Sequence, residues 1–170
     1  MAIDAPASGL SAAMSKGGKT MQLDAKLPEH KVVPLWILPD KHGETLNLAK
    51  RRGRAHMLLL VCAPGADPTP FVETLAPTLA DLRDLPVQGI AVVASEDEAG
   101  ALPSSPFTIV IDAAGKVRGQ YLPPDACAGL FALDRYGTLY HQWLAARIAD
   151  LPAATEVAEW MQAIGMQCSV

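Results

Sequence analysis

The sequence predicts an α/β fold with a mixed central sheet and flanking helices. Its clearest element is the run at 56–62, HMLLLVC, in which apolar residues follow one another without polar alternation. Such a run is typical of a strand that is buried on both faces. A break rich in Pro, Gly and Asp follows at 63–68, and a helix signal follows at Thr69. A strand, a loop and a helix in this order predict a functional site at the carboxyl end of the central strand.

Composition limits the classes of function that the chain can have. Half of the 170 residues are hydrophobic and the net charge is −4, which favours a globular domain and argues against a nucleic-acid partner. No apolar run approaches the ~18–20 residues that span a bilayer, and no signal-peptide pattern begins the chain. We therefore expect a cytoplasmic protein without a membrane span.

The metal-binding and redox residues are few and scattered. Cys62, Cys127 and Cys168 are widely spaced, so they predict neither a disulfide framework nor a paired metal site. The four histidines also lack the spacing of metal ligands. We expect no metal and no other cofactor.

The chain divides into one domain and two tails. Residues 1–29 are rich in Ala, Ser, Gly and Lys and predict a flexible tail, or else a segment that orders on a protein partner. Residues 30–165 form the predicted domain, and 166–170 form a C-terminal tail.

The first part of the domain predicts short elements. We expect a strand at 32–38, a turn at 39–43 and a second extended piece at 45–48. The basic run at 50–54 predicts a solvated loop before the central strand; the alternative is a site for phosphate or an acidic partner.

A helix is predicted from Thr69 to about Asp84. Thr69 is its expected cap, Pro70 fits its first turn, and Pro77 is expected to kink it. A buried strand at 87–94 follows.

Two later segments have the same ending. Both 107–117 and 130–139 contain an apolar strand closed by Asp-x-x-Gly, in which Asp112 and Asp134 are expected to cap turns. The residues after the first turn predict a strand or a short helix.

The end of the chain predicts a hairpin and a helix. The hairpin pairs 130–133 with 139–144. A closing helix spans 153–164, with Gly165 as its expected C-cap.

This order of elements is that of the thioredoxin fold, and residues 32–164 resemble the peroxiredoxins of the alkyl hydroperoxide reductase and thiol-specific antioxidant type. The resemblance implies a three-layer thioredoxin-like architecture. It rests on Leu46-Asn47-Leu48, Arg52-Gly53-Arg54, Thr69-Pro70, Pro77, and the Phe-x-x-Asp-x-x-Gly segment at 131–137.

The resemblance also implies a site from which the reactive residues are missing. Peroxiredoxins carry Thr-x-x-Cys at this helix start, and the cysteine attacks peroxide as a thiolate. In this chain Thr69 and Pro70 are present, but Val72 occupies the position of the cysteine. Ala128 stands where thioredoxins have a cis-proline and many peroxiredoxins have an arginine. Thr69, Pro70, Val72 and Ala128 are therefore interpreted as degenerate active-site positions.

Three functional hypotheses follow. The first is a redox-inactive accessory, scaffold or maturation subunit that binds a protein partner, with the N-terminal tail as one contact. This hypothesis is compatible with an oligomer. The second is a thiol-disulfide oxidoreductase or peroxidase that uses Cys62 or Cys127 instead. The third is a binding site for an anion or small ligand at the Thr69 helix start.

Overall fold

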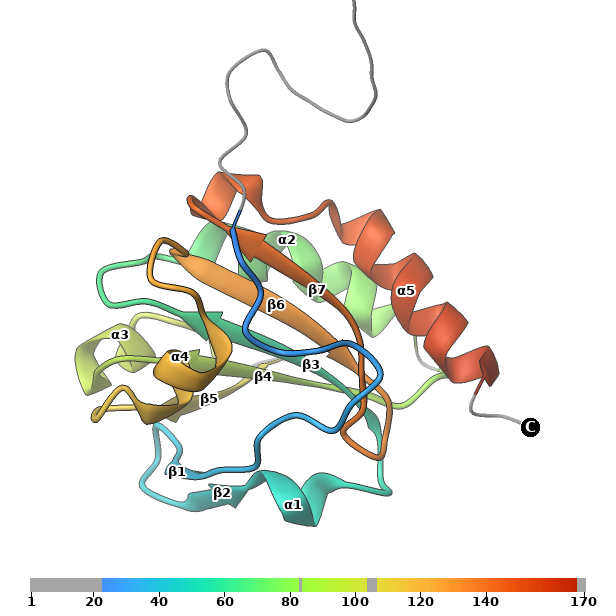
Figure 1. The fold of residues 1–170 in the computed structure, drawn as a ribbon, viewed down its shortest axis with the longest axis horizontal. Coiled ribbons are helices and arrows are strands. Elements are labelled where there is room, and N and C mark those ends of the chain that lie inside the picture. The colour runs from blue at the N-terminus through green and yellow to red at the C-terminus, as the bar shows by residue number, and fades with distance from the viewer. Residues whose placement is uncertain (1–22, 83, 104–106, 168–170) are drawn as a thin grey trace, which may run out of the picture.

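The computed structural model describes residues 23–82, 84–103 and 107–167, and a five-stranded mixed sheet forms its centre (Figure 1). The three strands in the middle and at one edge are parallel, and the last two are antiparallel to their neighbours. The predicted α/β fold with a mixed sheet is therefore confirmed. In spatial order the strands are β5 (Phe107–Ile111), β4 (Val87–Val93), β3 (His56–Cys62), β6 (Ala128–Leu133) and β7 (Leu139–Ala145).

Strand β3 lies between two apolar clusters. All seven of its residues are buried, and its side chains alternate between the faces of the sheet. Leu58 and Leu60 belong to the cluster under helices α2 (Thr69–Ala80) and α5 (Ala154–Gln167). Met57 and Leu59 belong to the cluster on the other face. This double burial explains why the central strand has no polar alternation.

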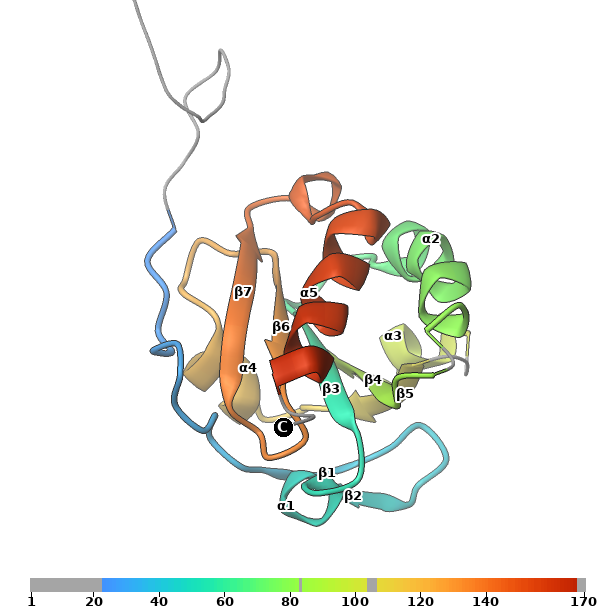
Figure 2. The same ribbon diagram turned by 90° about the vertical axis from the view of Figure 1, so that its right-hand side faces the viewer.

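The helices cover both faces of the sheet. Figure 2 shows α2 and α5 together on one side, and α4 (Lys116–Tyr121) on the other. The remaining helical segments are short: α1 (Leu48–Arg51), α3 (Glu96–Gly100) and a 3-10 turn at Ile148–Asp150. Within the described residues, no helix has both the length and the apolarity that crossing a bilayer requires.

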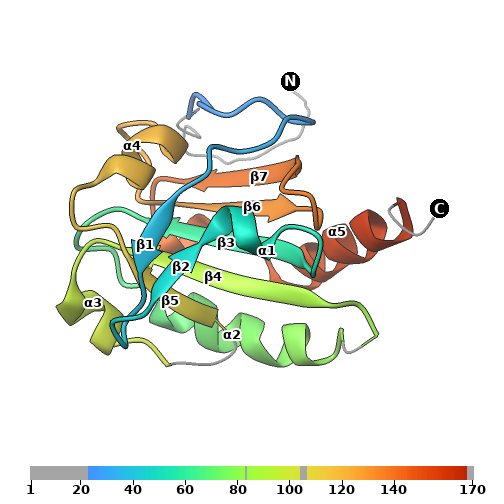
Figure 3. The same cartoon turned by 90° about the horizontal axis from the view of Figure 1, so that it is seen from below.

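The segment before the central strand differs from the prediction. A two-stranded sheet, β1 (Ile37–Pro39) with β2 (Thr45–Asn47), lies below the central sheet in Figure 1 and in front of it in Figure 3, the view from below. The predicted strand at 32–38 is therefore wrong in its extent, and Val32 instead bridges to Thr138. Pro34 has no N–H to donate, which prevents a continuous ladder through this stretch.

The start of the basic run at 50–54 also differs from the prediction. Helix α1 covers Lys50 and Arg51, where a loop was expected, and the Asn47 side chain caps it by accepting a hydrogen bond from Ala49 N at 3.0 Å. The remainder, from Arg52 to Arg54, is exposed.

Residues 23–31 lie against the domain beside β7. Leu27 is buried, and its carbonyl accepts a hydrogen bond from Gln142 Nε2 at 2.8 Å. The backbone of His30 and Lys31 exchanges two hydrogen bonds with Leu139. Of the predicted N-terminal tail, 23–29 thus contact the domain, and residues 1–22 lie outside the described residues.

Helix α2 begins at Thr69, as predicted, but it has a different cap and ends sooner than predicted. Pro68 is the N-cap, so the expectation that Thr69 caps the helix is wrong and Thr69 is its first residue. The helix ends at Ala80, because the chain turns through Asp81 and Leu82 before entering β4. Pro77 lies inside the helix as predicted.

Both predicted aspartate turns are confirmed. One Asp134 carboxylate oxygen accepts hydrogen bonds from Tyr136 N at 2.8 Å and Thr138 N at 3.0 Å. Asp112 accepts one from Arg118 N at 2.9 Å, at the start of the short helix α4. The predicted hairpin is also present as β6 and β7.

Gly165 is not the C-cap of the last helix. It is buried within α5, which continues to Gln167. A side chain at this position would overlap Leu85, so the absence of a Cβ atom lets α5 pack against the segment that leads into β4. The glycine thus reflects a tertiary contact and not a helix end.

Gly129 gives a prediction about packing. A Cβ atom there would lie 2.8 Å from Leu122 Cδ2 and 2.9 Å from two ring atoms of Phe131, whose ring is fully buried. We expect Gly129→Ala to lower the free energy of unfolding by about 1–3 kcal/mol. Urea denaturation measures this change.

The matched control is Gly100→Ala, because a Cβ atom there meets nothing within 4 Å and Gly100 ends a helical turn. This variant should be neutral or more stable by up to about 1 kcal/mol. Equal losses in the two variants would contradict the packing argument.

Candidate functional site

The predicted site lies where β3 and β6 meet at the carboxyl end of the parallel strands. Cys62, the last residue of β3, is opposite Ala128, the first residue of β6. One residue further on, Ala63 N donates a hydrogen bond to the Cys127 carbonyl at 2.8 Å. We call this region the Cys62 corner: Cys62, residues 63–72, Glu98, Cys127 and Ala128.

Val72 lies in the first turn of α2 and faces the sheet. It is fully buried and belongs to the same apolar cluster as Cys62 and Ala128. Thr69 is half-buried and Pro70 is exposed at the helix start. The structure therefore brings together the positions that the sequence identified, and an isopropyl group fills the space at the helix start.

The start of α2 already carries a negative charge from this chain. The Asp67 carboxylate accepts hydrogen bonds from Thr69, including one from its backbone N at 3.1 Å. These bonds, the side-chain one first, hold the pKa of the exposed Asp67 carboxyl below its usual value. Pro70 has no N–H, and Val72 N donates to the Pro68 carbonyl at 2.9 Å. Few backbone donors thus remain for an added anion.

Cys62 is in a poor environment for a thiolate. Burial is the main cause that raises the pKa of its thiol, to about 12, and the neighbouring Cys127, Glu98 and Asp67 add to the effect. Reactive thiols in proteins have lowered pKa values and sit beside cations or helix N-termini. Cys62 has the opposite surroundings, so it behaves as a small buried apolar residue.

Cys127 is half-buried and lies beside the same strand end. Burial raises the pKa of its thiol, and a hydrogen bond from the Ile148 backbone partly offsets this. Both cysteines are free thiols in the structure. Cys168 lies outside the described residues.

Glu98 is a structural member of the corner that the sequence prediction missed. One carboxylate oxygen accepts a hydrogen bond from Gly65 N at 2.8 Å, and the other accepts one from Ala94 N at 3.2 Å. The residue thereby joins the loop after β3 to the end of β4. Ser95 and Glu98 stand in the Ser-x-x-Glu spacing of a helix start, which is the sequence signal that indicates this position.

We expect Glu98→Ala to lower the free energy of unfolding by about 2 kcal/mol, because two backbone donors lose a charged acceptor. Hydrogen exchange at Gly65 should become faster as the loop loosens. The matched control is Glu96→Ala, because Glu96 is exposed and precedes it in the same helix. A similar loss in both variants would show that the carboxylate bonds are unimportant.

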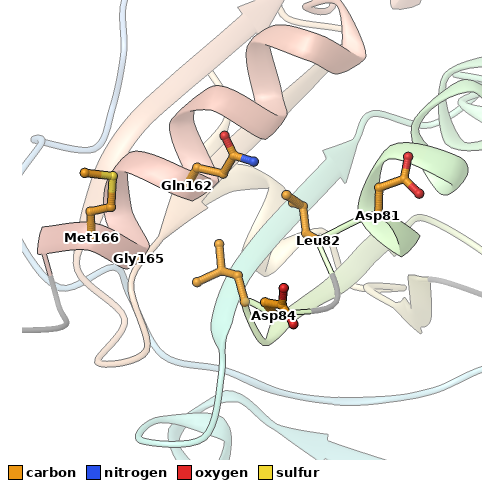
Figure 4. Close-up of a pocket in the computed structure, with 7 residues that line it drawn as sticks. Asp81, Leu82, Asp84, Gln162, Gly165 and Met166 are labelled. Carbon is orange, nitrogen blue, oxygen red and sulfur yellow. The ribbon is translucent and has the colours of Figure 1, made fainter.

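A separate groove of about 430 Å³ lies far from the corner, between the C-terminal ends of α2 and α5 (Figure 4). It contains none of the predicted site residues. Its lining is Asp81, Leu82, Asp84, Leu85, Gln162, Gly165 and Met166. Across the described part of the chain, no three His, Cys, Asp or Glu side chains gather closely enough to hold a metal ion.

Comparisons with known proteins identify the fold but not the activity. No family model matches the chain, and no curated protein matches it significantly. A solved structure described as the thiol:disulfide interchange protein DsbE of Chlorobium tepidum is similar over 81% of this chain and 98% of that chain, with a TM-score of 0.65 and 20% identity.

Two peroxidases are similar to a comparable degree. The mitochondrial 2-Cys peroxiredoxin of Plasmodium falciparum matches over 81% of this chain and 94% of its own, with a TM-score of 0.62 and 18% identity. The thiol peroxidase of Chromobacterium violaceum matches over 89% and 95%, with a TM-score of 0.63 and 11% identity. The chain therefore has a thioredoxin-like fold, with peroxiredoxin-like and DsbE-like structural neighbours at low identity.

Proposed function

We propose that this thioredoxin-like protein is redox-inactive and acts by binding another protein, as an accessory, scaffold or maturation subunit. The observation that carries this proposal is Val72. A fully buried hydrocarbon side chain stands at the helix start where the resemblance to peroxiredoxins expects a reactive cysteine. An isopropyl group can neither attack a peroxide nor exchange with a disulfide.

The charges around the corner support the same proposal. A thiolate needs a nearby cation or open helix donors to lower its pKa. Here burial is the main cause that raises the pKa of Cys62, the carboxylates of Glu98 and Asp67 add to the effect, and Asp67 occupies the helix start. A relocated thiol at Cys62 would therefore be almost entirely protonated at neutral pH.

Exposed apolar side chains suited to protein binding lie on the segment that leads into β1, on β1 itself and on the β6–β7 turn. Four of the large apolar side chains that are exposed in the described residues are Val32, Leu35, Ile37 and Tyr136. Arg52 lies beside Tyr136, because its Nε donates a hydrogen bond to the Tyr136 carbonyl at 2.9 Å. Apolar side chains, tyrosine and arginine together are typical of the energetic centre of protein interfaces.

Gentle purification of the native, untagged protein tests the proposal. We expect a defined protein to co-elute with it on size exclusion and to be lost when Ile37 or Tyr136 is replaced by Asp. The matched control is Met166→Asp, because Met166 is an exposed apolar residue on a different element and should leave the complex intact. Replacement of Cys62 and Cys127 by Ser should not affect binding. A lone monomer under these conditions would contradict the proposal.

The alternative is a thiol oxidoreductase or peroxidase that uses Cys62 or Cys127. The backbone hydrogen bond between Ala63 and Cys127 favours it, because that bond holds Cys127 beside the residue that follows Cys62. In such an enzyme one thiolate would reduce peroxide to water or alcohol and become a sulfenic acid. The second thiol would then displace water to form a disulfide. Mass spectrometry after stoichiometric peroxide decides: with no bridge and no trapped sulfenic acid, this alternative fails.

A further inference from the structure

A small pocket lies on the α4 side of the sheet, beside the loop that follows β3. Its volume is about 280 Å³, near the lower limit for small-molecule sites. Residues from three separate parts of the chain line it: Lys26 before the domain, Ala63 and Pro64 after β3, and Arg118 and Gly119 of α4. It borders the Cys62 corner at Ala63 and Pro64, but it contains none of the corner's buried side chains Cys62, Val72 and Ala128, which belong to the apolar cluster under α2.

Two cations meet at this pocket without a carboxylate in its lining. Lys26 Nζ donates a hydrogen bond to the Gly119 carbonyl at 2.8 Å, which fixes the ammonium group at the rim. The Arg118 guanidinium packs over Gly115, where a Cβ atom would overlap it. The chain as a whole is acidic, with a net charge of −4, whereas the lining of this pocket carries two cations and no carboxylate.

Arg118 also leaves a hydrogen-bond donor unused. Its Nη1 atom is buried and has no hydrogen-bond partner among the described residues. Buried polar atoms in proteins nearly always have a partner, and a charged donor without one points to a group that the protein itself does not supply. An oxyanion is the group that a guanidinium recognises best, because its N–H donors match two oxygens at once.

The rest of the lining indicates what kind of oxyanion fits. Leu122, Pro123 and Ala126 are buried side chains of the wall, and they offer carbon atoms instead of donors. Such a wall favours a ligand with an apolar body next to its charge. Inorganic phosphate would leave this wall without a partner.

We propose that this pocket binds a small organic carboxylate, with the carboxylate between Arg118 and Lys26 and its hydrocarbon part against Leu122 and Pro123. The inference is independent of the proposed function, because it requires neither a protein partner nor an inactive thiol. It also gives residues 23–29 a role, because Lys26 forms one side of the site.

Amide NMR of the full-length protein tests the pocket with three probes. Butyrate carries a carboxylate and a short hydrocarbon chain, butyramide has the same shape without charge, and phosphate has the charge without the hydrocarbon. We expect butyrate to shift the amides of Gly115 and Gly119, which line the pocket, but not that of the distant Gly137. Butyramide should cause no saturable shift, and phosphate should bind more weakly than butyrate.

Two variants and one control distinguish a specific binding site from a general effect of the protein's net charge. Arg118→Gln and Lys26→Gln should each weaken butyrate binding by about tenfold, because each removes a charged donor. Lys26 is exposed, so its variant tests the site even where Arg118→Gln disturbs folding. Lys116→Gln changes the net charge equally on the same helix outside the pocket and should alter affinity by less than twofold. Equal weakening by the control, stronger binding of phosphate, or no saturable shift with butyrate would overturn the proposal.

Discussion

In the native protein, Cys62 should react with iodoacetamide about a thousand times more slowly at pH 8 than an exposed thiol. The thiolate is the reactive form, and a pKa of about 12 leaves roughly one molecule in ten thousand ionised at that pH. An ordinary thiol, with a pKa of 9.0, is about one-tenth ionised. The ratio of the two fractions gives the expected difference, and burial of the sulfur slows the reaction further.

Peptide-level mass spectrometry over a time course measures this rate. The control is the same protein in concentrated guanidinium chloride, where Cys62 should react at the rate of an ordinary thiol. Cys127 should be intermediate, because it is half-buried and its pKa is also raised by burial. If the rate for native Cys62 is within tenfold of the rate for the unfolded protein, the Cys62 corner is open to reagents. The low reactivity of Cys62 then no longer supports a redox-inactive protein.

Phe131→Ala should remove about 3–5 kcal/mol from the free energy of unfolding, the range typical of a large aromatic deleted from a core. Phe131 is fully buried in β6 and stacks edge-on against Tyr121, with ring centroids 5.3 Å apart. Tyr121 in turn donates a hydrogen bond to the Pro34 carbonyl at 2.6 Å. Loss of the ring therefore loosens a contact that connects the central sheet to the segment before β1.

Urea denaturation measures this change, provided that the wild-type protein and the variant have the same dependence of the free energy of unfolding on urea concentration. Tyr136→Ala is the matched control, because it removes an aromatic ring that is 51% exposed in the turn between β6 and β7. It should cost less than about 1 kcal/mol. A loss as large as that of Phe131→Ala would mean that the two rings contribute equally and that burial does not decide the effect.

The sequence predicted the elements whose signals are local. The run at 56–62 has the boundaries that the structure gives to β3, and the two Asp-x-x-Gly turns have the expected capping bonds. Burial on both faces and turn capping each act over a few residues, so the pattern alone contains them. The strand predicted at 32–38 was longer than β1, because Val32 and Val33 form backbone contacts with the distant β6–β7 turn instead of extending β1.

The site was predicted only in part, for a related reason. Val72, Cys62 and Ala128 were identified because they occupy positions that the fold order defines. The role of Glu98 depends on a loop 33 residues earlier in the chain, and Gly165 depends on its contact with Leu85. Lys26 reaches the pocket that Arg118 lines through a hydrogen bond to the Gly119 carbonyl, 93 residues later in the chain. Neither the hydrophobic periodicity nor the residue spacing of a single sequence predicts such long-range contacts.

The backbone of His30 and Lys31 limits how another protein can attach. The amide and carbonyl of Leu139 are already engaged by the backbone of Lys31 and His30. A foreign strand therefore cannot extend the sheet at this point of β7 without first displacing the protein's own chain. Recognition by side chains avoids that competition, so a protein that binds beside Leu139 is expected to do so without adding a strand there.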